Sequence, residues 1–130
     1  MQKTATVAVI YNNKILIMRR GDSAPWMPGR YCLPGGHVEQ GEDATYAASR
    51  ELSEEAGISY PVDHFTTINV QYKSGYSKTV WVASVNSDKV HLNWEHDHYV
   101  WVNLQEAFSY SLVPGLKTTI KTLCDRGLLI

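Results

Sequence analysis

Three glutamates near the middle of the 130-residue chain have the spacing of a metal-binding surface. Glu51, Glu54 and Glu55 fall in Ala44–Ala56, a segment rich in good helix formers. At about 100° per residue of helix, their side chains share an arc of roughly 100°. Carboxylates gathered on one side of a helix can hold a divalent cation, and hard oxygen donors suit Mg²⁺ or Mn²⁺ better than Zn²⁺.

The position of these acids along the helix strengthens that interpretation. They occupy the last turn and a half, where the helix dipole disfavours negative charge by a few tenths to ~1 kcal/mol. Repulsion between neighbouring carboxylates adds to this cost. The alternative is a solvated helix face on which Arg50 and Glu54, spaced i and i+4, relieve the repulsion as an ion pair.

The segment Pro34-Gly35-Gly36 precedes the helix and favours the metal interpretation. Glycine has no side chain to block a backbone carbonyl from approaching a cation. Magnesium in proteins commonly bridges carboxylates to the phosphates of a substrate. The combination of residues therefore predicts phosphate chemistry.

The hydrophobic pattern and the turn residues predict the strands and helices that would position these residues. Together these elements predict an α/β fold in one domain spanning residues 1–130. The predicted strands are Thr4–Tyr11, Lys14–Arg20, Thr66–Tyr72, Lys78–Val85 and Tyr99–Asn103, and Tyr31–Leu33 is a short apolar segment. Helices are predicted at Ala44–Ala56, capped by Asp43 and Gly57, and from about Pro114 to Arg126. We expect a sheet with one helix packed on each face, an α/β/α sandwich, and the pattern leaves the strand order open.

Composition limits the partners of the chain. A formal net charge of −1 and a pI near 6.5 argue against a protein that coats nucleic acid, while a small anionic substrate fits a local metal site. No apolar run approaches the ~20 residues needed to cross a bilayer, and the first residues do not resemble a signal peptide. Cys32 and Cys124 fit neither a disulfide framework nor a zinc site, so we expect free thiols in a reducing cytoplasm.

Residues 36–58 together resemble the signature of a known family. The pattern runs glycine, five residues, glutamate, seven residues, Arg-Glu, an apolar residue, any residue, Glu-Glu, any residue, glycine and an apolar residue. It is similar to the Nudix box in full, and the approach Leu33–Gly36 and the later segment Glu95–Val102 also resemble the family. The chain length is similar to that of the compact MutT-type members. The resemblance implies a Nudix fold with a mixed sheet between two helices.

The resemblance also implies metal ligands. By their positions in the box, Glu54 and Glu55 resemble residues that bind the metal directly in the family, together with the carbonyl of Gly36. Glu51 resembles a third ligand or the group that helps activate water. The implied cofactor is Mg²⁺, with Mn²⁺ as a substitute.

Other box residues would hold this site in place. Arg50 would orient the glutamates, Glu42 would brace the loop through an ion pair with Arg50, and Gly35 and Gly57 would serve the backbone. Outside the box, Glu95 resembles an acidic residue that binds metal or acts as a general base in some members. The alternative is a loop glutamate with no catalytic part.

Substrate contacts are less marked in the sequence. Arg19 and Arg20 end a predicted strand and could reach phosphates, or be solvated strand-end arginines. His37 lies inside the box loop and could touch phosphate or be a bystander, and Tyr31 could stack on a base or belong to the core. Further candidate stacking residues are Trp26, Met27, Tyr72, Trp81 and Trp101. The remaining histidines, expected on the surface, are His64, His91, His96 and His98.

The predicted function is a magnesium-dependent pyrophosphohydrolase that cleaves a nucleoside or deoxynucleoside triphosphate to the monophosphate and pyrophosphate. Dinucleoside polyphosphates and nucleotide sugars are alternative substrates. A non-catalytic nucleotide-binding module and an isopentenyl diphosphate isomerase are alternatives of other classes, although such modules commonly lose the box carboxylates that this chain retains. The base, the attacked phosphorus and the oligomeric state are left open.

Overall fold

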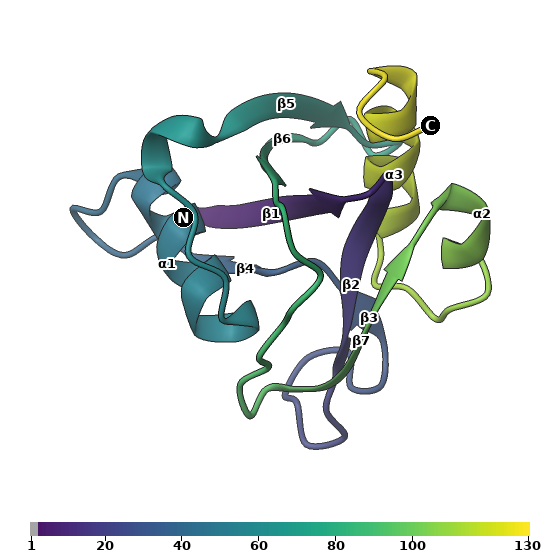
Figure 1. Ribbon diagram of the computed structural model, residues 1–130, viewed down its shortest axis with the longest axis horizontal. Helices are drawn as coiled ribbons and strands as arrows, with labels where there is room; N and C mark the ends of the chain where they lie inside the picture. Colours follow the sequence, from purple (N-terminus) through teal and green to yellow (C-terminus); the bar gives the residue numbers. More distant parts are fainter. Residues whose placement is uncertain (1–2) are drawn as a thin grey trace.

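The computed structural model describes residues 3–130, and within them the chain forms a mixed sheet of seven strands with helices on both sides (Figure 1). The strands are β1 (Thr4–Tyr11), β2 (Lys14–Arg20), β3 (Tyr31–Cys32), β4 (Gly35–His37), β5 (Thr66–Gln71), β6 (Ser77–Ser84) and β7 (His96–Val102). The helices are α1 (Ala44–Ala56), α2 (Leu104–Ala107) and α3 (Leu116–Asp125), with a short 3-10 turn, η1, at Val62–His64.

Strand β1 lies at the centre of the sheet. One of its edges pairs in parallel with β6, which in turn pairs with β5. The other edge is divided, because Thr4–Thr6 pairs with β4 whereas Ile10 and Tyr11 pair with β2. Strand β2 continues the sheet to β3 and β7. The division of one edge between β4 and β2 brings the Gly35–His37 segment against the beginning of the chain.

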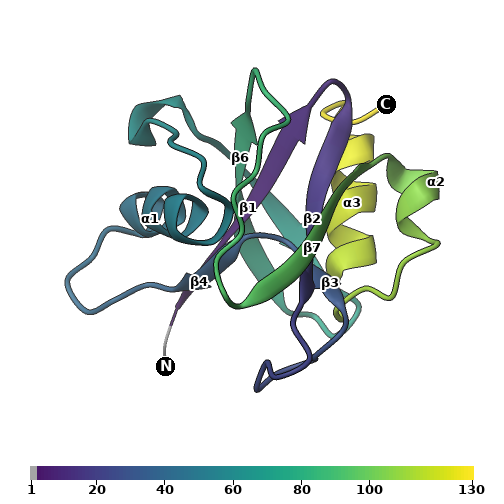
Figure 2. The same cartoon turned by 60° about the horizontal axis from the view of Figure 1, so that its bottom comes forward.

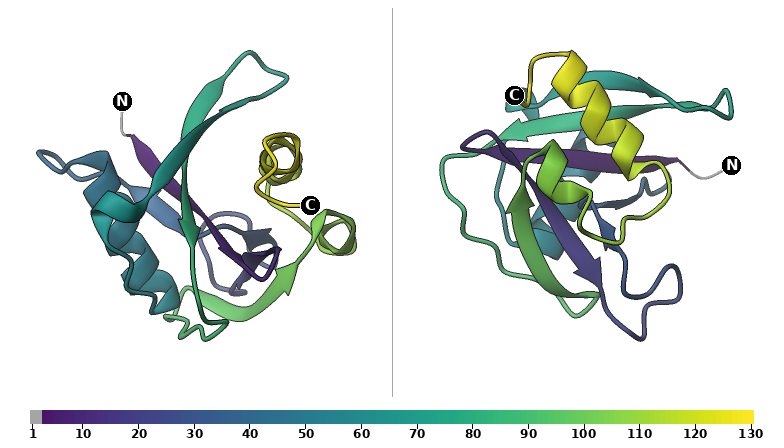
Figure 3. Two further views of the ribbon diagram at one scale, coloured as in Figure 1. Left: turned by 45° about the horizontal axis from the view of Figure 1, so that its top comes forward. Right: turned by 90° about the vertical axis from the view of Figure 1, so that its right-hand side faces the viewer.

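Side chains alternate between the two faces of the sheet, as expected of strands buried on both sides. Val7 and Val9 of β1 pack in one cluster with Leu52 of α1. Ala8 and Ile10 pack in a second cluster with Ile120 and Leu123, among other residues. Figures 2 and 3 show α1 and α3 on opposite sides of the strands. The predicted sandwich is thus confirmed.

Helix α1 begins and ends where the sequence predicts. The Asp43 carboxylate accepts hydrogen bonds from the backbone N–H groups of Thr45 and Tyr46, and Gly57 ends the helix in the left-handed region with φ 68°. Leu52 and its neighbours Ala48 and Ala56 are fully buried, so this stripe fixes the direction in which the glutamates project.

Strands β1 and β2 also have the predicted bounds, whereas the other predicted elements differ at their ends. The structure adds β3, β4, η1 and α2, which were not predicted as strands or helices. Strand β7 begins at His96, three residues before the predicted start, because residues 96 and 98 pair with the end of β2. Strand β4 was not predicted, since Gly35 and Gly36 carry no strand signal. Helix α2 was also not predicted, although the Asn103 and Glu106 side chains form a capping box at its start.

None of the helices in residues 3–130 combines the length and apolar character that a membrane span requires.

Candidate active site

The glutamates of α1 face the backbone of β4. The Glu55 side chain is only 6% exposed, and its Oε1 accepts a hydrogen bond of 2.9 Å from the N–H of Gly35. The Glu51 carboxyl lies directly over Gly36, where an added Cβ would come within 2.5 Å of it. Gly35 has φ 156°, and a Cβ there would collide with the backbone of Ala5. Both glycines therefore permit the close packing of the helix carboxylates on the loop.

Arg50 joins the loop to the helix. Its guanidinium donates two hydrogen bonds to Glu42, of 2.7 and 3.0 Å, and one of 3.1 Å to the carbonyl of His37. It also pairs with Glu51 at 3.0 Å and with Glu54 at 3.2 Å. These bonds raise the pKa of Arg50 and lower that of Glu42. The bracing predicted for Arg50 and Glu42 is present in the geometry, as is the Arg50–Glu54 pair of the solvated-face alternative.

Burial separates these interpretations. A solvated face leaves its acids in water, whereas burial raises the pKa of Glu55 to about 8, opposed by the Gly35 hydrogen bond and reinforced by the charges of Glu51 and Glu95. Burial likewise raises the pKa of Glu51. Acids removed from water beside other acids require a nearby positive charge to stay ionised.

Glu95 lies near this cluster on the segment that precedes β7. Its carboxylate accepts a hydrogen bond of 3.2 Å from the Asn93 side chain, whose carbonyl oxygen accepts the N–H of Glu95. The segment is attached to the end of α1 by backbone bonds from His91 to Ala56 and from Asn93 to Glu55. Sequence reasoning missed Asn93, which no motif marks.

The donor set fits a hard divalent cation in its chemistry. Glu51, Glu54, Glu55 and the Gly36 carbonyl offer oxygen atoms only, as Mg²⁺ and Mn²⁺ prefer. Within residues 3–130, no three acidic, histidine or cysteine side chains already converge on one point. The half-exposed side chain of Glu54 pairs with Arg50.

The two strand-end arginines lie on opposite faces of the sheet. Arg20 is on the α1 side, near enough to lower the pKa of Glu55, and its guanidinium contacts Trp26. Arg19 is on the α3 side, in ion pairs with Asp97 and Asp22.

Two other predicted substrate residues lie apart from the glutamate side chains. The Tyr31 ring packs edge-on against Tyr110 with centroids 4.8 Å apart. The side chain of His37 is exposed, and only its carbonyl contacts Arg50. Contact of Arg19, Tyr31 and His37 with substrate stays a prediction.

The expectation that His96 lies on the surface is wrong. Its side chain is 4% exposed, with Nε2 3.5 Å from Cys32 Sγ and Nδ1 3.4 Å from Asn93 Oδ1. His96 is buried because it pairs with Arg20 at the start of β7 and its ring lies against Cys32 of β3. Cys32 and Cys124 are free thiols, as predicted, and burial raises the pKa of Cys32 to about 12.

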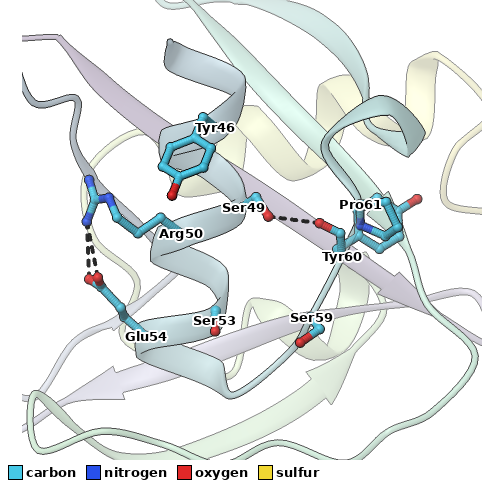
Figure 4. Close-up of a pocket in the computed structure, with 8 residues that line it drawn as sticks. All are labelled: Tyr46, Ser49, Arg50, Ser53, Glu54, Ser59, Tyr60 and Pro61. Atoms are coloured by element: carbon cyan, nitrogen blue, oxygen red, sulfur yellow. Dashed lines mark hydrogen bonds and ion pairs between the residues drawn. The ribbon is translucent and has the colours of Figure 1, made fainter. Parts of the chain in front are cut away.

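The structure has one hollow beside α1 and another beside α3. The first, of about 640 Å³, lies between α1 and Ser59–Pro61, with Arg50 and Glu54 at its edge (Figure 4). Figure 4 shows Arg50 reaching Glu54 along the outer side of α1. Glu51 and Glu55 do not line this groove.

The second hollow, a slot of about 390 Å³, lies between the β5–β6 hairpin and the start of α3. The rings of Tyr72 and Tyr76 stack on each other at its side, and Lys78 lines it. Lys78 was not singled out from sequence. Its signal was a charged residue at the same strand parity as the core residues Val80 and Val82.

Comparison with known proteins assigns the chain to a family. The family model described as NUDIX domain matches residues 1–123. The asymmetrical bis(5'-nucleosyl)-tetraphosphatase of Caenorhabditis elegans is 37% identical over 92 residues, which cover 65% of this chain and 66% of that relative, just under two thirds of its length. The nucleoside triphosphatase NudI of Klebsiella pneumoniae is 28% identical over 143 residues, covering 98% of this chain and 99% of the relative.

A solved structure agrees with these matches. The crystal structure of an Ap4A hydrolase binary complex from C. elegans has a TM-score of 0.75 and 26% identity, covering 97% of this chain and 98% of that one. Because the family model extends over nearly the whole sequence and the fold is shared along its length, the chain belongs to the Nudix hydrolase family.

Proposed function

We propose that this chain, acting as one domain, is a magnesium-dependent pyrophosphohydrolase that converts a nucleoside or deoxynucleoside triphosphate to the monophosphate and pyrophosphate. The observation that carries the proposal is the packing of Glu51 and Glu55 on the glycine backbone of β4, with Glu95 nearby. This arrangement concentrates negative charge at one partly buried place, which suits a divalent cation and the phosphates it binds.

Glu51, Glu54, Glu55 and the Gly36 carbonyl would hold magnesium, or manganese in its place. Such an ion, when bound, neutralises phosphate oxygens and lowers the pKa of a water molecule. Arg50 would keep Glu51 oriented through its bond of 3.0 Å while remaining fixed to Glu42.

The chain's own acids would complete the reaction. The oxygen of water forms a bond to phosphorus as the bridging P–O bond breaks, and a carboxylate accepts the proton that water loses. Glu51 and Glu95 are the two candidates for this base, and Asn93 holds Glu95 in position. Attack at the α- or the β-phosphorus yields the same two products from a triphosphate.

Two substrate classes have specific support. Similarity to NudI of Klebsiella pneumoniae extends over nearly the full length of both proteins and favours nucleoside triphosphates. Higher identity over a shorter stretch to the C. elegans tetraphosphatase supports a dinucleoside polyphosphate as the second candidate. In either case Tyr72 and Tyr76 offer aromatic surface for a base.

The deciding experiment incubates the full chain with magnesium and a panel of nucleoside triphosphates, dinucleoside polyphosphates and nucleotide sugars, and separates the products by anion exchange. Triphosphates should yield monophosphate and pyrophosphate, and Glu54→Gln should lower this rate by several orders of magnitude while the circular dichroism spectrum is unchanged. Asp63→Asn, which removes an exposed charge on η1, serves as the control. Full activity in Glu54→Gln, or no product from the panel, would leave a nucleotide-binding module as the better account.

A further inference from the structure

The slot beside α3 has an unusual distribution of hydrogen-bonding groups. Lys78, half-buried on β6, reaches Thr6 Oγ1 at 3.1 Å and lies 6.0 Å from the centre of the Tyr72 ring. In residues 3–130 no carboxylate oxygen lies within 4 Å of its Nζ, and no acidic residue lines the slot. An ammonium group has three donors and no acceptor, so after the bond to Thr6 two donors remain for a ligand.

The walls of the slot suit a flat aromatic ligand. The Tyr72 and Tyr76 rings stack on each other at 24° and supply one side. Gly115, which precedes α3 with φ 88°, lies so close to the ring that an added Cβ would be 3.1 Å from Tyr72 Cε1. The hydroxyl of Tyr72 is bonded to Thr119 at 2.9 Å, which fixes the ring against α3. Figure 3 shows α3 beside the β5–β6 hairpin, which is itself part of the sheet.

The slot is connected to the glutamates through β1. Thr6, which accepts the bond from Lys78, is paired in the β1–β4 ladder with Gly35, whose N–H holds Glu55. Since β6 and β4 pair with opposite edges of β1 at Thr6, a nucleotide with its base in the slot would extend its phosphates across β1 toward Gly35 and Gly36.

We propose that Lys78 is a specificity-determining residue that selects bases with a carbonyl oxygen at the position where adenine and cytosine carry an amino group, namely O6 of guanine and O4 of uracil and thymine. This inference rests on the proposed function. Guanine offers O6 and N7 as acceptors and thymine offers O4, whereas adenine and cytosine place an amino donor at the corresponding edge. An amino group facing an ammonium would leave both sets of donors unpaired, and a site built to donate rejects such a ligand strongly.

Desolvation supports the same assignment. Burial lowers the pKa of Lys78, with no acid nearby to compensate. A carbonyl oxygen brought against Nζ would return the hydrogen bonding that burial removed. The competing occupant is a phosphate group, which would also satisfy the ammonium, and the experiment separates the two.

The test compares kcat/KM for GTP, UTP, ATP and CTP with magnesium in the wild type, Lys78→Met and Lys89→Met. Lys89 is exposed and does not line the slot, so it matches the charge change outside the site. The wild type and Lys89→Met should prefer GTP and UTP by about tenfold or more. Lys78→Met should bring all four values to within about twofold by lowering those for GTP and UTP. Lys78→Gln, whose amide also accepts hydrogen bonds, should raise the value for ATP.

A binding measurement keeps the inference separate from the proposed function. Calorimetry in EDTA with GMP, AMP and inorganic phosphate should give tighter binding of GMP to the wild type, and this preference should vanish in Lys78→Met. If no triphosphate is hydrolysed, the proposed function fails and the monophosphate preference still decides the role of Lys78. A preference that survives in Lys78→Met overturns the inference, as does equal loss of GMP, AMP and phosphate binding, which would assign Lys78 to phosphate.

Discussion

At the scale of the residue, Glu55 stands out by its raised pKa. With a pKa of about 8, its side chain is largely protonated at neutral pH in the metal-free protein, because burial and the charges of Glu51 and Glu95 oppose ionisation. A ligand to magnesium must be deprotonated, so cation binding should release a proton near neutrality.

The same shift makes the stability of the metal-free protein depend on pH. Since the pKa of Glu55 is raised from 4.5 to about 8 on folding, its contribution is complete below pH 4.5 and is lost as the pH rises through 8. In EDTA, Glu55→Gln should therefore gain stability over the wild type across this window, by roughly a few kcal/mol at its upper end. Urea unfolding from pH 5 to 9 measures the difference. A constant gap between the two curves would contradict the assignment.

Gly36 gives a second prediction at the residue scale. In Gly36→Ala the new Cβ would displace the Glu51 carboxyl, a flexible side-chain end, so we expect kcat to fall about 10²-fold with little change in melting temperature. Gly41→Ala is the matched control. An added Cβ at Gly41 would meet no atom within 4 Å, but the residue has a left-handed backbone with φ 79°. It should lose about 1 kcal/mol of stability and keep its kcat. Equal kcat values for the two variants would argue against the Glu51–Gly36 packing.

Residue identities in the box were predictable because their contacts are local. The helix repeat places Glu51 and Glu55 on one side, and the short loop brings Glu42 within reach of Arg50. The inward direction of Lys78 could be predicted from its alternation with Val80 and Val82, but its contacts, the role of Asn93 and the burial of His96 could not, because each depends on which segments become neighbours. That Arg19 and Arg20 lie on opposite faces of the sheet could have been predicted from strand alternation alone.

At the scale of the element, α1 was predictable to the residue. Its ends are set by local chemistry, namely the Asp43 cap and the left-handed Gly57. Strand β4 could not be predicted, since its glycines pair only because β1 leaves half of one edge open to them. The early start of β7 likewise depends on pairing with the end of β2.

The Asp43 cap can be tested directly. Asp43→Ala removes the acceptor for two N–H groups and should cost about 1 kcal/mol, which lowers the melting temperature by about 4 °C. Asp43→Asn keeps an acceptor and should remain near the wild type. Because the glutamates lie at the opposite end of α1, kcat at a temperature where both variants are folded should change by less than about twofold. A large loss of kcat in Asp43→Ala would mean that the helix is not a rigid support.

At the scale of the whole molecule, the sheet divides the core into two clusters. Leu123 belongs to the cluster under α3 and Leu52 to that under α1, and both are fully buried. The mixture of strands with two helices predicted a helix on each face of the sheet. The strand order could not be predicted, since the parallel pairing of β1 with β6 joins distant segments.

This division predicts separable effects. Leu123→Ala and Leu52→Ala should each lower the free energy of unfolding by about 2–5 kcal/mol. Only Leu52→Ala should also lower kcat, because Leu52 adjoins Glu51 in the helix that carries the carboxylates. Chemical unfolding and steady-state kinetics at low temperature measure the pair, and a similar fall of kcat in Leu123→Ala would contradict the division.

The backbone bonds that join residues 91 and 93 to the end of α1 have a practical consequence for protein engineering. Since peptide groups make this attachment, replacing side chains cannot easily release it. A graft of the acidic helix into another scaffold would therefore have to include the strand-entry peptide as a second fragment, or Glu95 would be left behind and the transplanted surface would lack one of its two candidate bases.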